Sequence, residues 1–242
     1  MITKLVRLPG LVGEYFFSSG CGVCGGTLLS MEETWYGLCA DCQNFFTIVY
    51  ENRCSLCGRP LISETDRCLS CRNGALSYVD QGAALFPYTG NYRNLLRAYK
   101  FEGCRRLGNF LAEKILEGLS CFSAPLSRDA VLVPVPPKPG KLKKIGWDQI
   151  DYIAKILKRR FRETRSFRVY PCLKRLSFQS QKGLNREDRK TNLLGRIRPV
   201  RKAPREAVLF DDVITTGATL DACAAALKDG GAEKVYGICL FY

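Results

Sequence analysis

From about residue 82 onward, short apolar runs alternate with longer amphipathic stretches. Unbroken apolar runs are typical of strands buried on both faces, and apolar residues that recur every three or four positions are typical of helices. The pattern predicts strands at 82–88, 130–135, near 167–173, 206–210 and 234–242, and helices at 91–101, 107–119 and 218–231. This alternation predicts an α/β domain over residues 80–242, with a mainly parallel sheet and flanking helices.

Another helical face lies between the second and third predicted strands. Its apolar residues recur at helical spacing: Trp147, Ile150, Ile153, Ala154 and Leu157. Such a stripe more often packs in a core than contacts a ligand, so we expect it to face the sheet.

The preceding part of the chain, residues 15–75, is organised by cysteines instead. Eight of them form four pairs whose members are separated by two residues: Cys21 and Cys24, Cys39 and Cys42, Cys54 and Cys57, and Cys68 and Cys71. This spacing lets one tight turn direct two thiolates at one ion, so four pairs suit two tetrahedral zinc sites. The sequence has no histidine, so both sites would be all-cysteine. We call residues 15–75 the cysteine module and expect its metal to support its folding.

Two other interpretations of the cysteine pairs remain. A redox motif with this spacing usually occurs once, in a compact α/β context, whereas an iron–sulfur cluster also takes four cysteines. Sites filled by four cysteines leave no open coordination position, so we expect a structural role. The other five cysteines lie among apolar neighbours and are expected to be small core residues: Cys104, Cys121, Cys172, Cys223 and Cys239.

Charge is concentrated in one part of the chain. Residues 138–205 contain 22 Lys and Arg against five Asp and Glu, a local net charge of +17, so the rest of the chain sums to −3 and the whole chain to +14. Such a segment suits polyanions, either nucleic acid or the phosphates of a small substrate, although a solvated helix face explains 155–168 equally well. Residues 1–20 lack the apolar stretch of a secretory signal, and no apolar run is long enough to span a bilayer. We therefore expect a cytoplasmic protein without membrane insertion.

The segment from Asp211 to Thr219 joins a predicted strand to a predicted helix. A phosphate here would meet the free amides at the start of the helix and the hydroxyls of the threonines, while Gly217 permits close approach of the backbone. Paired carboxylates accept hydrogen bonds from ribose hydroxyls, so the segment suits a ribose 5-phosphate. The alternative is that the acids end the strand and the threonines cap the helix. The candidate residues are Asp211, Asp212, Thr215, Thr216, Gly217, Ala218 and Thr219.

The string AVLFDDVITTGATL resembles the phosphoribosyl-pyrophosphate (PRPP) signature of type I phosphoribosyltransferases. Together with the cysteine pairs, AYKFEG, VLVPVPP, GWDQ and SQKGLNREDRKTNL, it resembles the ComF family over nearly the whole chain. Members of this family join a zinc module to a type I phosphoribosyltransferase-like domain and are associated with natural competence and DNA uptake. The resemblance therefore implies that fold for residues 80–242, with PRPP as substrate or ligand.

The resemblance also implies roles for residues outside the 211–219 segment. Lys100 or the lysines of 138–144 would stabilise charge on the leaving group, and the turn containing Pro136, Pro137 and Lys138 would approach pyrophosphate. Gln181, Arg189 and Asn192 match a polar segment that resembles the mobile loop of related transferases, although an ordinary surface loop is the alternative.

The chain departs from the family at GWDQ. Gln149 matches, but Ile145 stands at the family's arginine position and Asp148 at its asparagine position. With Lys143 and Lys144 just upstream, either a lysine supplies the displaced charge or pyrophosphate binding is weakened.

Three functions follow as hypotheses. A phosphoribosyltransferase would displace pyrophosphate from PRPP with the help of magnesium, while Asp211 and Asp212 orient the ribose. A nucleic-acid accessory would bind single-stranded DNA through 138–205 and act beside a competence helicase, with PRPP as a regulator or a vestige. Its aromatic residues would stack on bases or belong to the core, and these are Phe161, Phe167, Tyr170 and Phe178. A nucleobase salvage enzyme is disfavoured by the appended cysteine module.

Overall fold

In the computed structural model, the described residues are 20–61, 65–164, 167–177 and 195–242. Five parallel strands form one sheet in the order β1-β7-β6-β2-β3. Their bounds are β1 Gln81–Phe86, β2 Val131–Pro134, β3 Arg168–Val169, β6 Glu206–Val213 and β7 Lys234–Phe241. Two short strands, β4 Leu173–Arg175 and β5 Ile197–Pro199, pair in a separate antiparallel ribbon. The expected α/β fold with a parallel sheet is confirmed.

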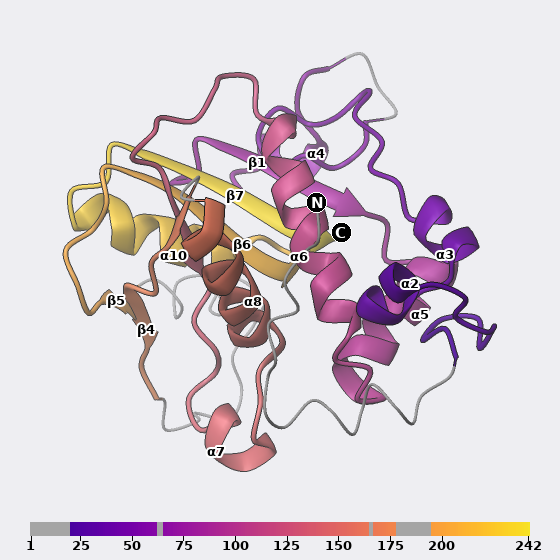
Figure 1. The fold of residues 1–242 in the computed structure, drawn as a ribbon. Helices are drawn as coiled ribbons and strands as arrows, with labels where there is room; N and C mark the ends of the chain where they lie inside the picture. Colours follow the sequence, from indigo (N-terminus) through magenta and orange to yellow (C-terminus); the bar gives the residue numbers. More distant parts are fainter. Residues whose placement is uncertain (1–19, 62–64, 165–166, 178–194) are drawn as a thin grey trace, which may run out of the picture.

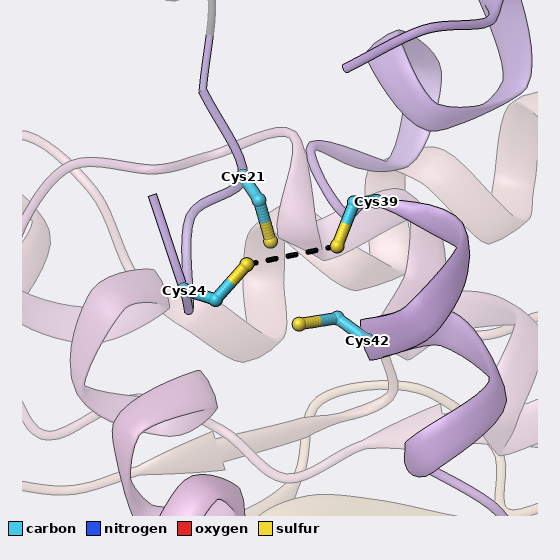
Figure 2. Close-up of side chains that lie close together, drawn as sticks. All are labelled: Cys21, Cys24, Cys39 and Cys42. Carbon is cyan, nitrogen blue, oxygen red and sulfur yellow. Dashed lines mark hydrogen bonds between the residues drawn. The ribbon is translucent and has the colours of Figure 1, made fainter. Parts of the chain in front are cut away.

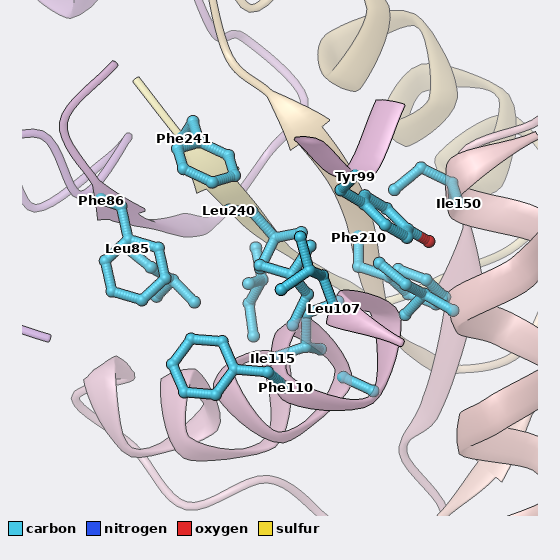
Figure 3. Packing of buried hydrophobic residues seen from close by; sticks show 14 of the residues in the cluster. Leu85, Phe86, Tyr99, Leu107, Phe110, Ile115, Ile150, Phe210, Leu240 and Phe241 are labelled. Carbon is cyan, nitrogen blue, oxygen red and sulfur yellow. The ribbon is translucent and has the colours of Figure 1, made fainter. Parts of the chain in front are cut away.

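Helices cover both faces of the sheet (Figure 1). One face packs against α5 Gly90–Phe101, α6 Leu107–Gly118 and α8 Gln149–Thr164, and the other against α10 Ala218–Asp229. Successive residues of β6 point to opposite faces, so Val208 and Phe210 join the first apolar cluster while Ala207 and Leu209 join the second. Figure 3 shows the aromatic and aliphatic side chains of the first cluster.

The cysteine module contributes to both apolar clusters. Its helices are short: α2 Met31–Tyr36, α3 Ala40–Phe45 and α4 Leu69–Arg72. Phe46, which is fully buried, packs its ring on those of Phe86 and Phe110 in the first cluster. Cys57 and Cys71 belong to the second cluster, on the opposite face of the sheet. The module therefore lies against the sheet domain from both sides.

The structure corrects the prediction near 167–173. Instead of one strand, β3 ends at Val169 and β4 begins at Leu173, with Pro171 between them. Proline has no N–H to donate to a ladder, and the chain leaves the main sheet at this point. β6 also extends beyond the predicted 206–210 through Asp211 and Asp212 to Val213.

Two further elements were not predicted, a 3-10 turn at Leu119–Cys121 and the short helix α7 at Lys141–Ile145. In the part of the chain that the structure describes, no helix is long and apolar enough to cross a membrane.

Candidate functional site

A cavity of about 460 Å³ opens at the carboxyl ends of β2 and β6. Ligands of open parallel sheets bind at this edge, because the loops that leave neighbouring strands diverge there. β6 supplies Asp211, Asp212 and Val213, and the chain after β2 supplies Val135 to Lys138. The remaining lining residues are Lys100, Phe101, Lys141, Ile145, Trp147, Asp148, Gln149, Ile150, Arg175 and Thr219. The structure thus brings together most of the sequence-predicted site residues outside the cysteine module.

A continuous polar network runs along one wall of this cavity. Lys100 Nζ lies 2.5 Å from Asp212 Oδ2, and the same oxygen accepts a hydrogen bond from Gln149 Nε2. Lys141 Nζ donates to Gln149 Oε1 and lies 2.6 Å from Asp148 Oδ2. Four elements that are distant in sequence are joined in this way: α5, α7, the start of α8 and β6. The network fixes the positions of Asp212 and Gln149 before any ligand arrives.

Asp148, which replaces the family's asparagine, has a structural role. It is buried, and its Oδ1 accepts hydrogen bonds from the backbone N–H groups of Ile150 and Asp151, which caps the start of α8. The lysine that balances its charge is Lys141. Lys143 and Lys144, which the sequence had suggested for a compensating charge, lie exposed on α7.

Asp211 has an unusual electrostatic environment. Burial, followed by repulsion from the adjacent Asp212, raises the pKa of Asp211 to about 8, although the charge of Lys100 opposes this shift. One of its oxygens accepts a hydrogen bond from the backbone N–H of Asp212 at 2.8 Å. Near neutral pH, Asp211 therefore carries a proton for much of the time and can donate a hydrogen bond as well as accept one.

The chain between β6 and α10 offers backbone donors. Gly217 has a φ of 79°, in the left-handed region that favours glycine, and lies at the N-cap position of α10. Within the described part of the chain, the N–H groups of Thr215, Thr216 and Gly217 have no hydrogen-bond acceptor. Both threonines are exposed, and Ala218 and Thr219 begin the helix. Free amides at a helix start form a setting for a phosphate.

Sequence reasoning did not assign Arg175 to the site, and it included Lys141 only among the lysines of 138–144. Lys141 lies on the unpredicted helix α7, and Arg175 ends β4, whose pairing with β5 brings it to the cavity. Only the high density of basic residues in 138–205 pointed towards them. Gln181, Arg189 and Asn192 lie outside the described residues.

The eight paired cysteines form two groups. The first cysteine group is Cys21, Cys24, Cys39 and Cys42, and the second is Cys54, Cys57, Cys68 and Cys71. Within each group the four sulfur atoms lie within 4.8 Å of one another. Figure 2 shows the first group converging on a common centre, with 3.6 Å between the sulfurs of Cys24 and Cys39. Four sulfurs at about 2.3 Å from a tetrahedral zinc are separated by about 3.8 Å, so both groups fit such an ion.

The surroundings of the sulfurs also suit a cation. Burial disfavours ionisation of Cys54, but backbone N–H groups of Cys68, Cys57 and Leu56 outweigh it and lower the pKa of Cys54 to about 7. Burial raises the pKa of Cys57 to about 12, and the charge of Cys54 adds to the shift. Without a positive ion, a charge on Cys54 therefore opposes ionisation of Cys57. A divalent metal removes this penalty.

The remaining cysteines are placed as expected. Cys172, Cys223 and Cys239 are buried in the second apolar cluster, while Cys104 and Cys121 are partly buried against the first.

A basic surface lies on α8 and in the β3 to β5 region. Its exposed cations are Lys155, Lys158, Arg159, Arg160, Arg168, Lys174, Arg198, Arg201 and Lys202. Of the aromatic residues considered for base stacking, Phe167 packs against the core. The guanidinium groups of Arg168 and Arg201 lie 4.8 and 5.8 Å from the ring centre of Tyr170. The side chains of Phe161 and Phe178 lie outside the described residues.

Two curated relatives cover most of the chain. Competence protein ComFC of Streptococcus pneumoniae is 24% identical over 226 residues, which span 89% of this chain and 96% of the relative. Competence protein F of Haemophilus influenzae is 26% identical over 226 residues, which span 91% of this chain and 95% of the relative. No family model matches the chain. The matches extend through the cysteine module as well as the sheet domain.

Proposed function

We propose, from its confirmed resemblance to the ComF family, that this chain serves in natural competence and binds PRPP in the cavity at the carboxyl ends of β2 and β6. The observation that carries the PRPP proposal is the make-up of the cavity wall. Four cationic side chains, Lys100, Lys138, Lys141 and Arg175, line it together with the adjacent acids Asp211 and Asp212. A volume of about 460 Å³ lies in the range of small-ligand sites.

The charges of the wall suit a phosphorylated ribose. Lys100 and Lys141 are paired with Asp212 and Asp148, whereas Lys138 and Arg175 have no ion pair among the described residues. These last two are therefore available for pyrophosphate. The acids would accept hydrogen bonds from ribose hydroxyls, and the free amides of residues 215–217 would bind the 5-phosphate.

The proposal includes a magnesium ion that binds together with PRPP. Asp212 Oδ2 already contacts Lys100 and Gln149, so the acids are not a ready-made metal cage. Mg²⁺ commonly uses substrate phosphates together with one or two carboxylates, and it would neutralise charge on pyrophosphate. Asp211 is the acid left to reach it, and it would give up its proton when the metal binds.

The same arrangement suits transfer chemistry as a further step of the proposal. The bond between the anomeric carbon and one pyrophosphate oxygen would break with its electron pair left on that oxygen, the acceptor atom would bond to the carbon through its own electron pair, and the acceptor's proton would pass to water. The negative charge would spread over the oxygens of the pyrophosphate. Lys138, Arg175 and Lys100 would stabilise the charge that develops on those oxygens. Pyrophosphate release with candidate nucleobases measures this step separately from binding.

Calorimetric titration with PRPP and magnesium tests the binding site. We expect binding by the wild type and a loss of affinity of about tenfold or more, or 1.4 kcal/mol, in the double variant Asp211→Ala, Asp212→Ala. Lys143→Ala is the matched control, because this exposed lysine lies outside the cavity lining. Equal affinities of the double variant and the wild type would refute the site.

Both cysteine groups are proposed to hold structural zinc. All four ligands of each site come from the chain, so the metal would leave no position for substrate. Metal analysis of the purified protein should give two zinc ions per chain, whereas iron or an absence of metal contradicts the proposal.

Binding of single-stranded DNA is the second candidate, favoured by the basic surface on α8 and the β3 to β5 region. Because arginines lie against the ring of Tyr170 and Phe167 packs against the core, we expect phosphate contacts to dominate over stacking. The affinity for an oligonucleotide should then fall steeply with salt concentration, and Arg198→Ala with Lys202→Ala should reduce that salt slope by about 1 to 2. Binding that is insensitive to salt argues against this candidate.

A further inference from the structure

The turn that carries Cys54 and Cys57 of the second cysteine group contacts the loop that leads into α10. Arg59 follows Cys57 by two residues, and its guanidinium Nη2 donates to the backbone carbonyls of Ile214, at 2.6 Å, and Thr215. The backbone of Arg59 is itself held in the metal-binding turn, because its carbonyl accepts a hydrogen bond from Cys54 N at 2.7 Å. One residue thus connects the turn that carries two metal ligands to the 211–219 segment.

This contact orients the loop amides. In a trans peptide the carbonyl and the following N–H point in opposite directions. Since the carbonyls of Ile214 and Thr215 point towards Arg59, the N–H groups of Thr215 and Thr216 point away from it and from the cysteine module. These are two of the three loop N–H groups that have no acceptor within the described chain. Arg59 therefore holds the backbone in the orientation that leaves its donors free for an anion.

The chain that follows the second cysteine group makes a second contact with the same region. Asp221 Oδ1, on α10, accepts hydrogen bonds from the N–H groups of Ser77 at 2.7 Å and Tyr78 at 2.8 Å. The side chain of Leu76 lies so close to Gly217 that a Cβ there would come within 2.8 Å of it. Residues 76–78 follow Cys71 and helix α4 closely in the chain. The loop is therefore held on both sides of Gly217.

We propose that Arg59 is a positioning residue for the anion site and that metal loading of the second cysteine group controls anion affinity. A metal-binding turn depends on its ion for its conformation, so loss of the ion releases the backbone that directs Arg59. The first cysteine group packs against the other face of the sheet and has no described contact with the 211–219 segment. The proposal rests on the proposed anion-binding function and assigns its control to one of two similar metal sites.

Substitution of Arg59 tests the positioning role. With PRPP and inorganic pyrophosphate as separate titrants, we expect Arg59→Met to weaken binding by about tenfold or more, since it removes two charge-assisted hydrogen bonds. Arg59→Lys should restore part of the affinity. Arg67→Met is the control, because Arg67 lies in the same module with a side chain that is 52% exposed. Zinc content should stay at two ions per chain in all three variants. Wild-type affinity in Arg59→Met would overturn the proposal.

Removal of cysteine ligands from each metal site in turn tests whether the second cysteine group alone controls anion affinity. The double variant Cys68→Ser, Cys71→Ser should weaken pyrophosphate binding far more than the double variant Cys39→Ser, Cys42→Ser. The comparison is made between proteins that each retain one zinc ion. Equal losses in the two variants would show a general destabilisation and overturn the specific link.

Hydrogen exchange separates this proposal from the proposed function, because it needs no ligand. The N–H of Ile214 bonds to Phe241 O and that of Asp221 to Gly217 O, so both report on the loop and on the start of α10. Their exchange should accelerate in Arg59→Met and in Cys68→Ser with Cys71→Ser, but not in Arg67→Met. If exchange accelerates while the wild type fails to bind either titrant, the proposed function fails and the positioning role stands. Unchanged exchange refutes the positioning role itself.

Discussion

The side chain of Asp148 is buried, and its two carboxylate oxygens make different interactions. One caps α8 through two backbone N–H groups, and the other contacts Lys141. The chain therefore combines a helix cap and an ion pair at a position where the ComF family has a neutral asparagine. Lys141 contacts Asp148 and Gln149, and it lines the wall of the cavity together with the acids of β6.

Lys141→Met should lower the free energy of unfolding by about 1–3 kcal/mol, because a buried carboxylate then loses a charged partner. Lys143→Met, on the same short helix but exposed, should change it by less than about 0.5 kcal/mol. Urea denaturation measures both values. Equal stability of the two variants would mean that Lys141 contributes no more than a surface lysine.

Asp211 should make stability depend on pH in the opposite direction from an ordinary aspartate. Its pKa is raised from 3.8 to about 8 in the folded protein, first by burial and then by Asp212. Between these values the folded state binds a proton that the unfolded state has lost, so its contribution to stability falls as pH rises. Asp211→Asn is neutral at every pH and should gain thermal stability relative to the wild type between pH 5 and 9. Parallel pH profiles of melting temperature would contradict the raised pKa.

At the scale of elements, the strands of the sheet and their helices were predictable, because their apolar runs and helical apolar stripes are visible in the sequence. The separation of β3 from β4 was not, since apolar residues flank Pro171 on both sides. Helix α7 is short and polar and has no periodicity to detect. For the same reason the acids and threonines of the site could be predicted from one local string, whereas Lys141 and Arg175 reach it through tertiary contacts.

The turn after Cys57 lies directly against the backbone of β1. Gly58 has a φ of 70°, and an added Cβ would come within 2.4 Å of Ala83 Cα. At Gly82, which precedes Ala83, an added Cβ would come within 2.8 Å of Leu56 O and 3.2 Å of Cys57 Cα. Two glycines therefore allow the metal-binding turn and the strand to pack backbone against backbone.

Gly58→Ala should destabilise the protein well beyond the conformational cost of a left-handed alanine. Gly74→Ala is a matched control, since Gly74 has a φ of 73° but an added Cβ there would meet nothing within 4 Å. We expect Gly74→Ala to cost about 1–2 kcal/mol and Gly58→Ala to cost more, because the turn must move away from β1. Thermal unfolding and the rate of zinc release to a chelator measure the difference. Similar values for both variants would show that the close packing adds nothing.

At the scale of the whole molecule, the two cysteine groups lie against opposite faces of one sheet. The first group and Phe46 join the cluster under α5 and α6, and the second group joins the cluster under α10. From the sequence, residues 15–75 and 80–242 were expected to be separate domains. Both apolar clusters contain residues from each of these two parts of the chain. We therefore expect the metal sites to contribute to the stability of the sheet.

Removal of the metals should therefore lower the stability of the sheet domain as well as that of the cysteine module. A chelator should shift one cooperative calorimetric transition to lower temperature, and added zinc should restore it, because an ion bound only to the folded state stabilises whatever folds with it. The fluorescence of Trp147, which packs against Tyr99 in the sheet domain, reports on that part; Trp35→Phe removes the module's own tryptophan signal. An unchanged Trp147 transition in the chelated protein would instead show that residues 80–242 fold independently.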